Sequence, residues 1–223
     1  MTKKELAEKF FGCLQTLYPD ADCTLDYKEP LQLLIATQLA AQCTDARVNI
    51  VTKDLFVKYP DVYAFANADL HELESDIRST GFYHNEAKNI IACCKQLIAD
   101  YGGVVPDSMD ELLKLSGVGR KTANLVLGDI FGKGGMVIDT HAKRILLRVG
   151  LTKETEPVKV EKSTEKLVPR EKQSAFCHRL VMHGRALCTA RNPKCGECPA
   201  ASFCKEGSAF THSEKSTKKV DIK

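Results

Sequence analysis

Apolar residues recur every three or four positions along most of the chain, which is the spacing of one face of an α-helix. Alternation with a period of two, which is typical of a half-buried strand, is nearly absent. We therefore expect an all-α protein. The helical pattern covers residues 4–18, 30–42, 47–58, 84–100, 108–115, 120–131, 140–149, 158–168 and 172–187.

Clusters of proline, glycine, asparagine and aspartate interrupt this pattern where turns are expected. The breaks are YPDADC (18–23), YPD (59–61), GFYHN (81–85), YGGVVPDS (101–108), GKGG (132–135) and NPKCGECP (192–199). We predict two helical domains, one of residues 22–132 and one of residues 1–21 together with 133–211. Residues 212–223 form a polar, basic tail that we expect to be disordered.

The composition is that of a globular protein made outside the secretory route. The chain has 223 residues, of which 43% are hydrophobic and 27% charged, enough for one large or two small domains. Its apolar stretches are far shorter than the roughly 20 residues that cross a bilayer. Residues 1–19 read as an amphipathic helix and not as a signal peptide. We therefore expect no export or transit segment and a cytoplasmic location, associated with the nucleoid.

Charge is unevenly distributed, although the formal net charge is only +3. Residues 54–76 carry six acids and one base, whereas residues 114–150 carry seven bases and two acids. A polyanion would be attracted to the second region and repelled by the first. Two ordinary solvated helix faces are the alternative interpretation.

Two glycines, Gly117 and Gly119, precede a predicted helix that begins with two cations, Arg120 and Lys121. The unpaired amides of a helix N-terminus already carry partial positive charge, so cations there need an explanation. One is a bound phosphate, held by the amides of a helix-hairpin-helix turn that Val118 would anchor in the core. The other is chemistry, because a disfavoured ammonium loses its proton more readily and becomes a nucleophile. A plain connection between two helices is the alternative.

Asp139 stands eighteen residues beyond Lys121, directly before the expected helix at 140–149. An aspartate in this place is most often only an N-cap. Together with a nucleophilic lysine, it also suits the stabilisation of positive charge on a reacting sugar. His141 could orient such a site, but it could equally be an ordinary hydrogen-bonded histidine.

Four of the ten cysteines gather near the C-terminus. They are separated by six, two and five residues: Cys188, Cys195, Cys198 and Cys204. Four thiolates can hold zinc or a [4Fe–4S] cluster. Structural zinc usually uses two close pairs, and only one close pair is present, so the spacing favours iron. Arg191 and Lys194 lie between the first two cysteines, where a tethered loop could present them to a phosphate; a solvated loop is the alternative. The other six cysteines occur in apolar helical patterns, as small buried thiols do.

The segments LSGVGRKTANLVLG and VIDTHAKRI, the four-cysteine set, LLIATQLAAQCTD and GFYHNEAKNI together resemble the endonuclease III family of DNA glycosylases and lyases, over essentially residues 1–211. The resemblance implies that Lys121 is the nucleophile, Asp139 its acidic partner, and the four cysteines the ligands of a [4Fe–4S] cluster. It implies that the enzyme removes oxidised pyrimidines from duplex DNA, at a site between the domains. It also implies cleavage 3′ to the abasic site by β-elimination through a lysine Schiff base.

A damaged base must leave the stack to reach such a lysine, and its place in the duplex must be filled. Gln42 has a donor and an acceptor for the orphaned base, and Phe82 is an apolar wedge. Both match the family's DNA-inserting loops, although the second loop often carries leucine where this chain has Phe82. The alternatives are that Gln42 caps a helix and that Phe82 belongs to the core.

Two other functions remain open at this point. A mismatch adenine glycosylase shares the hairpin and the cluster, but it usually lacks the lysine and carries an extra C-terminal domain. A non-catalytic DNA-binding module would not need Lys121 at all. We expect a monomer with no membrane association. Its expected partner is double-stranded DNA containing damaged bases or abasic sites.

Overall fold

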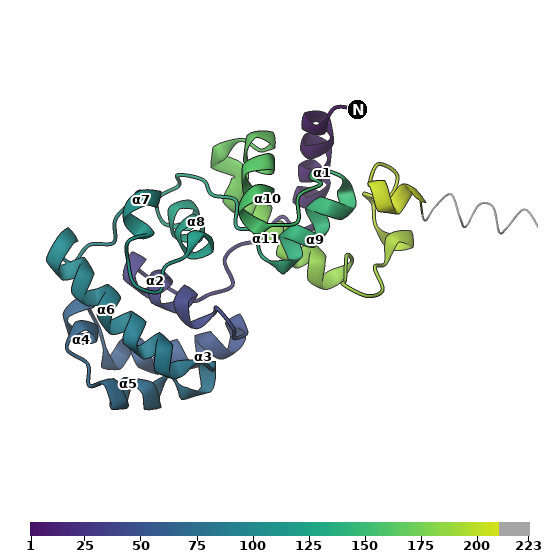
Figure 1. Cartoon of the computed structure of the whole chain (residues 1–223). Coiled ribbons are helices and arrows are strands. Elements are labelled where there is room, and N and C mark those ends of the chain that lie inside the picture. Colours follow the sequence, from purple (N-terminus) through teal and green to yellow (C-terminus); the bar gives the residue numbers. More distant parts are fainter. Residues whose placement is uncertain (210–223) are drawn as a thin grey trace, which may run out of the picture. The chain divides into compact units, whose positions relative to one another are not determined.

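A computed structural model describes residues 1–209 of the chain (Figure 1), and every regular element within that range is a helix. The prediction of an all-α protein is confirmed. The predicted tail, residues 212–223, lies outside the described residues. No helix in the described range is long and apolar enough to cross a membrane.

The chain divides into two compact units. One is the continuous segment Cys23–Gly132, and the other combines Met1–Asp22 with the residues from Lys133 onward. The second unit is therefore assembled from both ends of the chain. Its N-terminal helix must pack against helices that follow more than a hundred residues later in the sequence.

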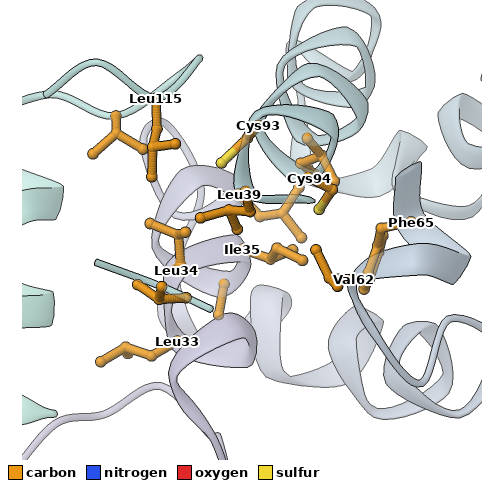
Figure 2. Packing of buried hydrophobic residues seen from close by; sticks show 14 of the residues in the cluster. Leu33, Leu34, Ile35, Leu39, Val62, Phe65, Cys93, Cys94 and Leu115 are labelled. Atoms are coloured by element: carbon orange, nitrogen blue, oxygen red, sulfur yellow. The ribbon is translucent and has the colours of Figure 1, made fainter. Parts of the chain in front are cut away.

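The continuous unit contains seven α-helices. They are α2 (Pro30–Leu39), α3 (Asp45–Lys58), α4 (Val62–Ala66), α5 (Leu70–Asp76), α6 (Tyr83–Tyr101), α7 (Met109–Leu112) and α8 (Arg120–Asp129), with a 3-10 turn at Arg78–Thr80. Helix α2 is apolar around most of its circumference because it is buried in the middle of this unit. Its Leu33, Leu34 and Ile35 are at most 1% exposed, and Figure 2 shows them grouped with Leu39, Val62, Phe65 and the α6 thiols Cys93 and Cys94. Burial of each such side chain adds about 1.5–3 kcal/mol to the stability of the fold, relative to leaving it exposed.

Helices α4 and α5 were not predicted, because they are short and lie in the acidic stretch 54–76. Each begins at an aspartate whose side chain caps it: Ala64 donates its N–H to Asp61 Oδ1 at 2.8 Å, and Glu72 donates to Asp69 Oδ1 at 2.9 Å. Lys58, the only base of that stretch, pairs with Glu72 and Asp76. The caps and ion pairs thus add local order to a segment whose Val62, Phe65 and Leu73 are buried in the core.

The discontinuous unit contains α1 (Lys3–Leu17), α9 (Thr140–Val149), α10 (Pro157–Thr164) and α11 (Gln173–Ala186), with 3-10 turns at Glu165–Leu167, Arg170–Lys172 and Cys195–Glu197. Helix α11 packs against both α1 and α9. The rings of Phe10 and Phe176, both fully buried, meet edge to face at 6.2 Å between centroids. This contact fixes α1 against α11, directly beside the loop that carries the four clustered cysteines.

Candidate functional site

The helix-hairpin-helix expected from the sequence is formed by α7, a short turn and α8. Gly119 is the N-cap of α8, and Arg120 and Lys121 are its first two residues. Val118 is buried at 7% exposure, and its N–H donates to the carbonyl of Leu115 at 3.1 Å. The turn is therefore anchored to the core through Val118, with Gly119 and Lys121 on the exposed side.

The two hairpin glycines are required for different reasons. Gly117 has φ = 75°, and a Cβ on it would stand 2.8 Å from Gln38 Oε1 and 2.9 Å from Asn89 Cβ. Backbone conformation and internal packing therefore both demand glycine at 117. Gly119 has φ = −95°, and a Cβ there would meet nothing within 4 Å. Its missing side chain leaves free space on the outside of the chain, where a ligand can approach the backbone.

Gln96 on α6 holds the hairpin from behind. Its Oε1 accepts the N–H of Ser116 at 2.8 Å, and its Nε2 donates to the carbonyl of Lys114 at 3.4 Å. Sequence reasoning missed this residue, because a glutamine on a helix gives no sign of what lies opposite. The turn is thus fixed by two hydrogen bonds from a single side chain, in addition to the burial of Val118.

Lys121 lies in the first turn of α8 with an exposed side chain. This turn contains no acidic residue, and its N-cap glycine provides no capping side chain. The amides at this helix end therefore keep the positive potential that attracts an anion. Arg120, which is half-buried, adds a second cation beside them.

Asp139 is the N-cap of α9, as the simpler interpretation expected. Its Oδ1 accepts the N–H of Ala142 at 2.7 Å, and its side chain is half-buried. The cap uses one of the two carboxylate oxygens, so capping and a chemical role are compatible. Asp139, like Lys121, lies at the N-terminal end of a helix.

His141 makes an ordinary hydrogen bond within its own helix. Arg144 Nη2 lies 3.1 Å from His141 Nδ1, and because arginine is only a donor, this nitrogen accepts. Burial lowers the pKa of His141; the Asp139 carboxylate opposes that shift, and Arg144 and Arg185 reinforce it. His141 thus makes the hydrogen bond that the simpler interpretation expects, and a role in orienting the site stays a prediction.

Cys177 on α11 supports the segment that leads into Asp139. Val137 donates its N–H to Cys177 Sγ at 3.2 Å, and the thiol lies 4.0 Å from the carbonyl oxygen of Gly135. The sequence suggested only a small buried thiol at this position. The thiol is buried, but it also holds the backbone two residues before Asp139.

The four clustered cysteines line one pocket that opens to solvent. Apolar side chains, among them Phe10, Val149 and Leu187, line part of the remaining wall, and polar or charged side chains line the other part: Arg148, His183, Lys194 and Glu206. Within residues 1–209, no three histidine, cysteine or acidic side chains converge as ligands of a single metal ion. Four thiols that line one pocket without converging on a single ion suit a group of several atoms, such as an iron–sulfur cluster.

Burial raises the pKa of the Cys195, Cys198 and Cys204 thiols above the ordinary value for cysteine. Bound iron would remove these protons, since a metal ligand must be a thiolate. Hydrogen-bond donors already face three of the sulfurs, among them Cys198 Sγ, which the backbone N–H of Ala200 faces. Arg148 Nη1 lies 3.5 Å from Cys188 Sγ, and the N–H of Gly207 lies 3.5 Å from Cys204 Sγ.

Two arginines of α9 hold the loop that begins at Cys188. Arg144 donates to the carbonyl of Cys188 at 2.9 and 3.1 Å, and Arg148 donates to the carbonyls of Thr189 and Ala190 at 2.6 and 2.9 Å. These two cations, which the charge pattern counted toward a polyanion-binding surface, are engaged inside the protein. The loop held by Arg144 and Arg148 carries Arg191 and Lys194, whose side chains are exposed.

Gln42 and Phe82 both lie on the surface. Gln42 is exposed in the turn between α2 and α3, and the cap of α3 is Thr44, not Gln42. Phe82 is 59% exposed, so it does not belong to the core. Its φ of 36° is the only positive value at a non-glycine residue in the described chain. A bulky side chain in this strained conformation is typical of positions held for function.

Comparison with known proteins identifies the family. Residues 35–170 match the model of the HhH-GPD superfamily base excision DNA repair protein, and residues 188–204 match the iron-sulfur binding domain of endonuclease III. The chain is 49% identical to endonuclease III of Synechocystis sp., over 93% of this chain and 95% of that protein. It is 47% identical to endonuclease III of Bacillus subtilis, over 86% and 88% of the two chains.

Comparison with solved structures identifies the same family. A non-covalent endonuclease III–DNA complex and a trapped endonuclease III–DNA covalent intermediate each match with a TM-score of 0.88 and 43% identity, covering 95% of this chain and 99% of theirs. A thermostable thymine-DNA glycosylase, at 24% identity and a TM-score of 0.84, shares the fold. The hairpin, the four-cysteine cavity and these matches together show that the chain belongs to the endonuclease III family of base excision DNA repair proteins.

Proposed function

We propose that this protein removes oxidised pyrimidines from duplex DNA and cuts the strand 3′ to the resulting abasic site, with Lys121 as the nucleophile. The observation that carries the proposal is the exposed Lys121 at the start of α8, directly after the hairpin. A relative 43% identical to this chain has been trapped as a covalent intermediate with DNA. A side-chain amine in this place suits the same chemistry.

The first step replaces the base by the lysine. The lone pair of Lys121 Nζ attacks C1′ of the sugar, the bond from C1′ to the base nitrogen breaks, and the base leaves with that electron pair and a proton. Positive charge develops on the sugar ring in the transition state. The carboxylate oxygen of Asp139 that does not cap α9 is the group we assign to stabilise this charge.

The second step breaks the strand. Opening of the bond from C1′ to the ring oxygen gives a Schiff base between C1′ and Nζ, which acidifies the hydrogens on C2′. Removal of one of them expels the phosphate from C3′, so that the strand breaks 3′ to the lesion. Water then hydrolyses the imine and restores Lys121. A water nucleophile in place of the lysine would release the base without this elimination.

Binding of the backbone falls to groups that do not read sequence. The amides of Gly117 and Gly119, with the Arg120 cation, form the proposed phosphate site at the start of α8. Val118 supports this site from the core, because its N–H already donates to the carbonyl of Leu115. Arg191 and Lys194 form a second one on the loop held by α9. Backbone contacts of this kind suit an enzyme that scans long stretches of duplex DNA.

Gln42 and Phe82 are proposed to fill the space left by the flipped nucleotide. Their exposure supports the assignment, and neither side chain is needed for capping or for the core. Gln42 would pair with the orphaned base through its amide, and Phe82 would hold the neighbouring bases apart.

The protein carries a [4Fe–4S] cluster, and we propose Cys188, Cys195, Cys198 and Cys204 as its ligands. When bound, the cluster supplies a rigid tether at both ends of the Arg191 loop. A cytoplasmic, nucleoid-associated location stays a prediction, supported by the nature of the substrate.

A set of duplexes, each with one defined lesion, tests the substrate class. We expect base release and strand cleavage on an oxidised pyrimidine, and strand cleavage alone on an abasic site, which bypasses the first step. Faster release of a mismatched adenine, with no cleavage of the abasic duplex, would favour the mismatch adenine glycosylase. Binding to every duplex without any product would favour a non-catalytic module.

A further inference from the structure

A buried histidine links helix α1 to the cysteine cavity. His183 on α11 is 2% exposed and lines the cavity together with the four cysteines. Its Nδ1 lies 3.3 Å from Tyr18 Oη, and its Nε2 lies 3.8 Å from Cys198 Sγ. One imidazole thus bridges a tyrosine hydroxyl and a cysteine sulfur.

The surroundings hold this ring in place. The Phe10 and Tyr18 rings meet the imidazole edge to face, at 5.9 and 6.0 Å between centroids. The backbone carbonyl of His183 accepts the N–H of Cys188 at 2.8 Å. His183 therefore contacts two of the four cysteines, one through its side chain and one through its backbone.

The ligand chemistry fixes the direction of both hydrogen bonds. A cysteine sulfur bound to iron has no proton, so it can only accept. His183 Nε2 must then carry the N–H that points to Cys198. Nδ1 is left as the acceptor, and the Tyr18 hydroxyl donates to it.

The other side-chain donor to a clustered sulfur has a different setting. Arg148, which faces Cys188, also binds two loop carbonyls and pairs with Glu206, whose side chain is 55% exposed. His183 donates from a wall formed by the Phe10 and Tyr18 rings. A hydrogen bond in such a low-dielectric place is electrostatically stronger than one near water.

We propose that His183 is a positioning residue for the cluster: its N–H to Cys198 raises the reduction potential of the [4Fe–4S] cluster, and Tyr18 holds the ring in the donating tautomer. The hydrogen bond withdraws electron density from the ligand sulfur. It therefore stabilises the more electron-rich state of the cluster. Without this bond, the cluster gives up an electron more easily.

The test compares two substitutions of similar size, made in the full-length, cluster-loaded protein. His183→Gln keeps an N–H that can reach Cys198, whereas His183→Leu has none. Voltammetry of the adsorbed protein gives the reduction potential, and iron analysis gives the cluster content. We expect His183→Leu to shift the potential to more negative values, His183→Gln to stay near the wild type, and Tyr18→Phe to shift it less, in the same direction.

His178→Leu is the matched control, because it makes the same change on the same helix at a residue that does not line the cavity. It should leave the potential unchanged. Equal potentials in His183→Leu and His183→Gln, at full iron content, would overturn the proposal. If His183→Leu does not retain iron, Tyr18→Phe decides: a wild-type potential in that variant contradicts the proposal, and a negative shift supports it.

Discussion

Alanine substitutions at the two hairpin glycines should separate folding from DNA binding. At Gly117 the left-handed backbone costs an alanine about 1–2 kcal/mol. The overlap of its Cβ with Gln38 and Asn89 costs about 1–3 kcal/mol more. Gly117→Ala should therefore lower the free energy of unfolding by about 2–5 kcal/mol, a large part of the roughly 5–15 kcal/mol of a typical protein. The Tm should fall by roughly 4–20 °C.

Gly119→Ala should leave the stability nearly unchanged and weaken DNA binding. Its φ of −95° suits any residue, and the added methyl meets nothing within 4 Å. Alanine is a poorer N-cap than glycine, but it also reduces the entropy of the unfolded chain by about 0.4–1 kcal/mol. Stability should thus change by less than about 1 kcal/mol. Losing one backbone hydrogen bond to a phosphate costs about 1.5–3 kcal/mol, so Kd for duplex DNA should rise roughly 10- to 150-fold.

Calorimetry gives the stability of both variants, and fluorescence anisotropy with an undamaged and an abasic duplex gives the affinity. The affinity for both duplexes should fall by the same factor, because the proposed hairpin site would bind only the DNA backbone. Wild-type affinity in Gly119→Ala would refute the assignment of a phosphate to the hairpin. A loss of stability equal to that of Gly117→Ala would show that the turn serves only the fold.

Three further predictions address individual side chains. Asp139→Asn should slow base release strongly and lower stability by about 0.5–2 kcal/mol through the weakened cap of α9; a drop in Tm with unchanged single-turnover rates would leave Asp139 as a cap alone. Arg191→Ala and Lys194→Ala should each weaken binding to any duplex and reduce the slope of log K against log salt by about one, whereas a lesion-dependent loss would contradict a backbone contact. Phe82→Ala should slow turnover on a paired, stacked base more than on an abasic site, since only the paired base must be unstacked; equal losses on both substrates would exclude the wedge.

The periodic pattern of apolar residues predicts the long helices of the fold, but it does not predict the short ones. The apolar faces of the long helices predict them from the sequence, as for α6 over Tyr83–Tyr101. Helices α4 and α5 are too short to show a periodic pattern: an aspartate caps each of them, Lys58 pairs with α5, and Phe65 and Leu73 bury the two helices in the core. Helix α2 ends at Leu39, before the predicted limit of 42, because the chain turns there toward the Thr44 cap of α3.

The supports of the candidate site could not be foreseen for a related reason. Gln96 reaches Ser116 across 20 residues, Cys177 reaches Val137 across 40, and Arg144 reaches Cys188 across 44. Such contacts depend on the packing of whole helices, which no local pattern encodes. The motif residues themselves could be proposed because their spacing is fixed by chemistry within a short stretch of chain.

The most direct test of the central claim is reductive trapping with borohydride. The reagent reduces a Schiff base between Lys121 and C1′ to a stable amine, which joins the protein to the DNA. A labelled duplex with one oxidised pyrimidine should yield a protein–DNA adduct with the wild-type protein. Lys121→Gln should yield none, while binding the abasic duplex with nearly unchanged affinity. An adduct in Lys121→Gln at wild-type yield, or base release by the wild-type protein without any adduct, would contradict the account.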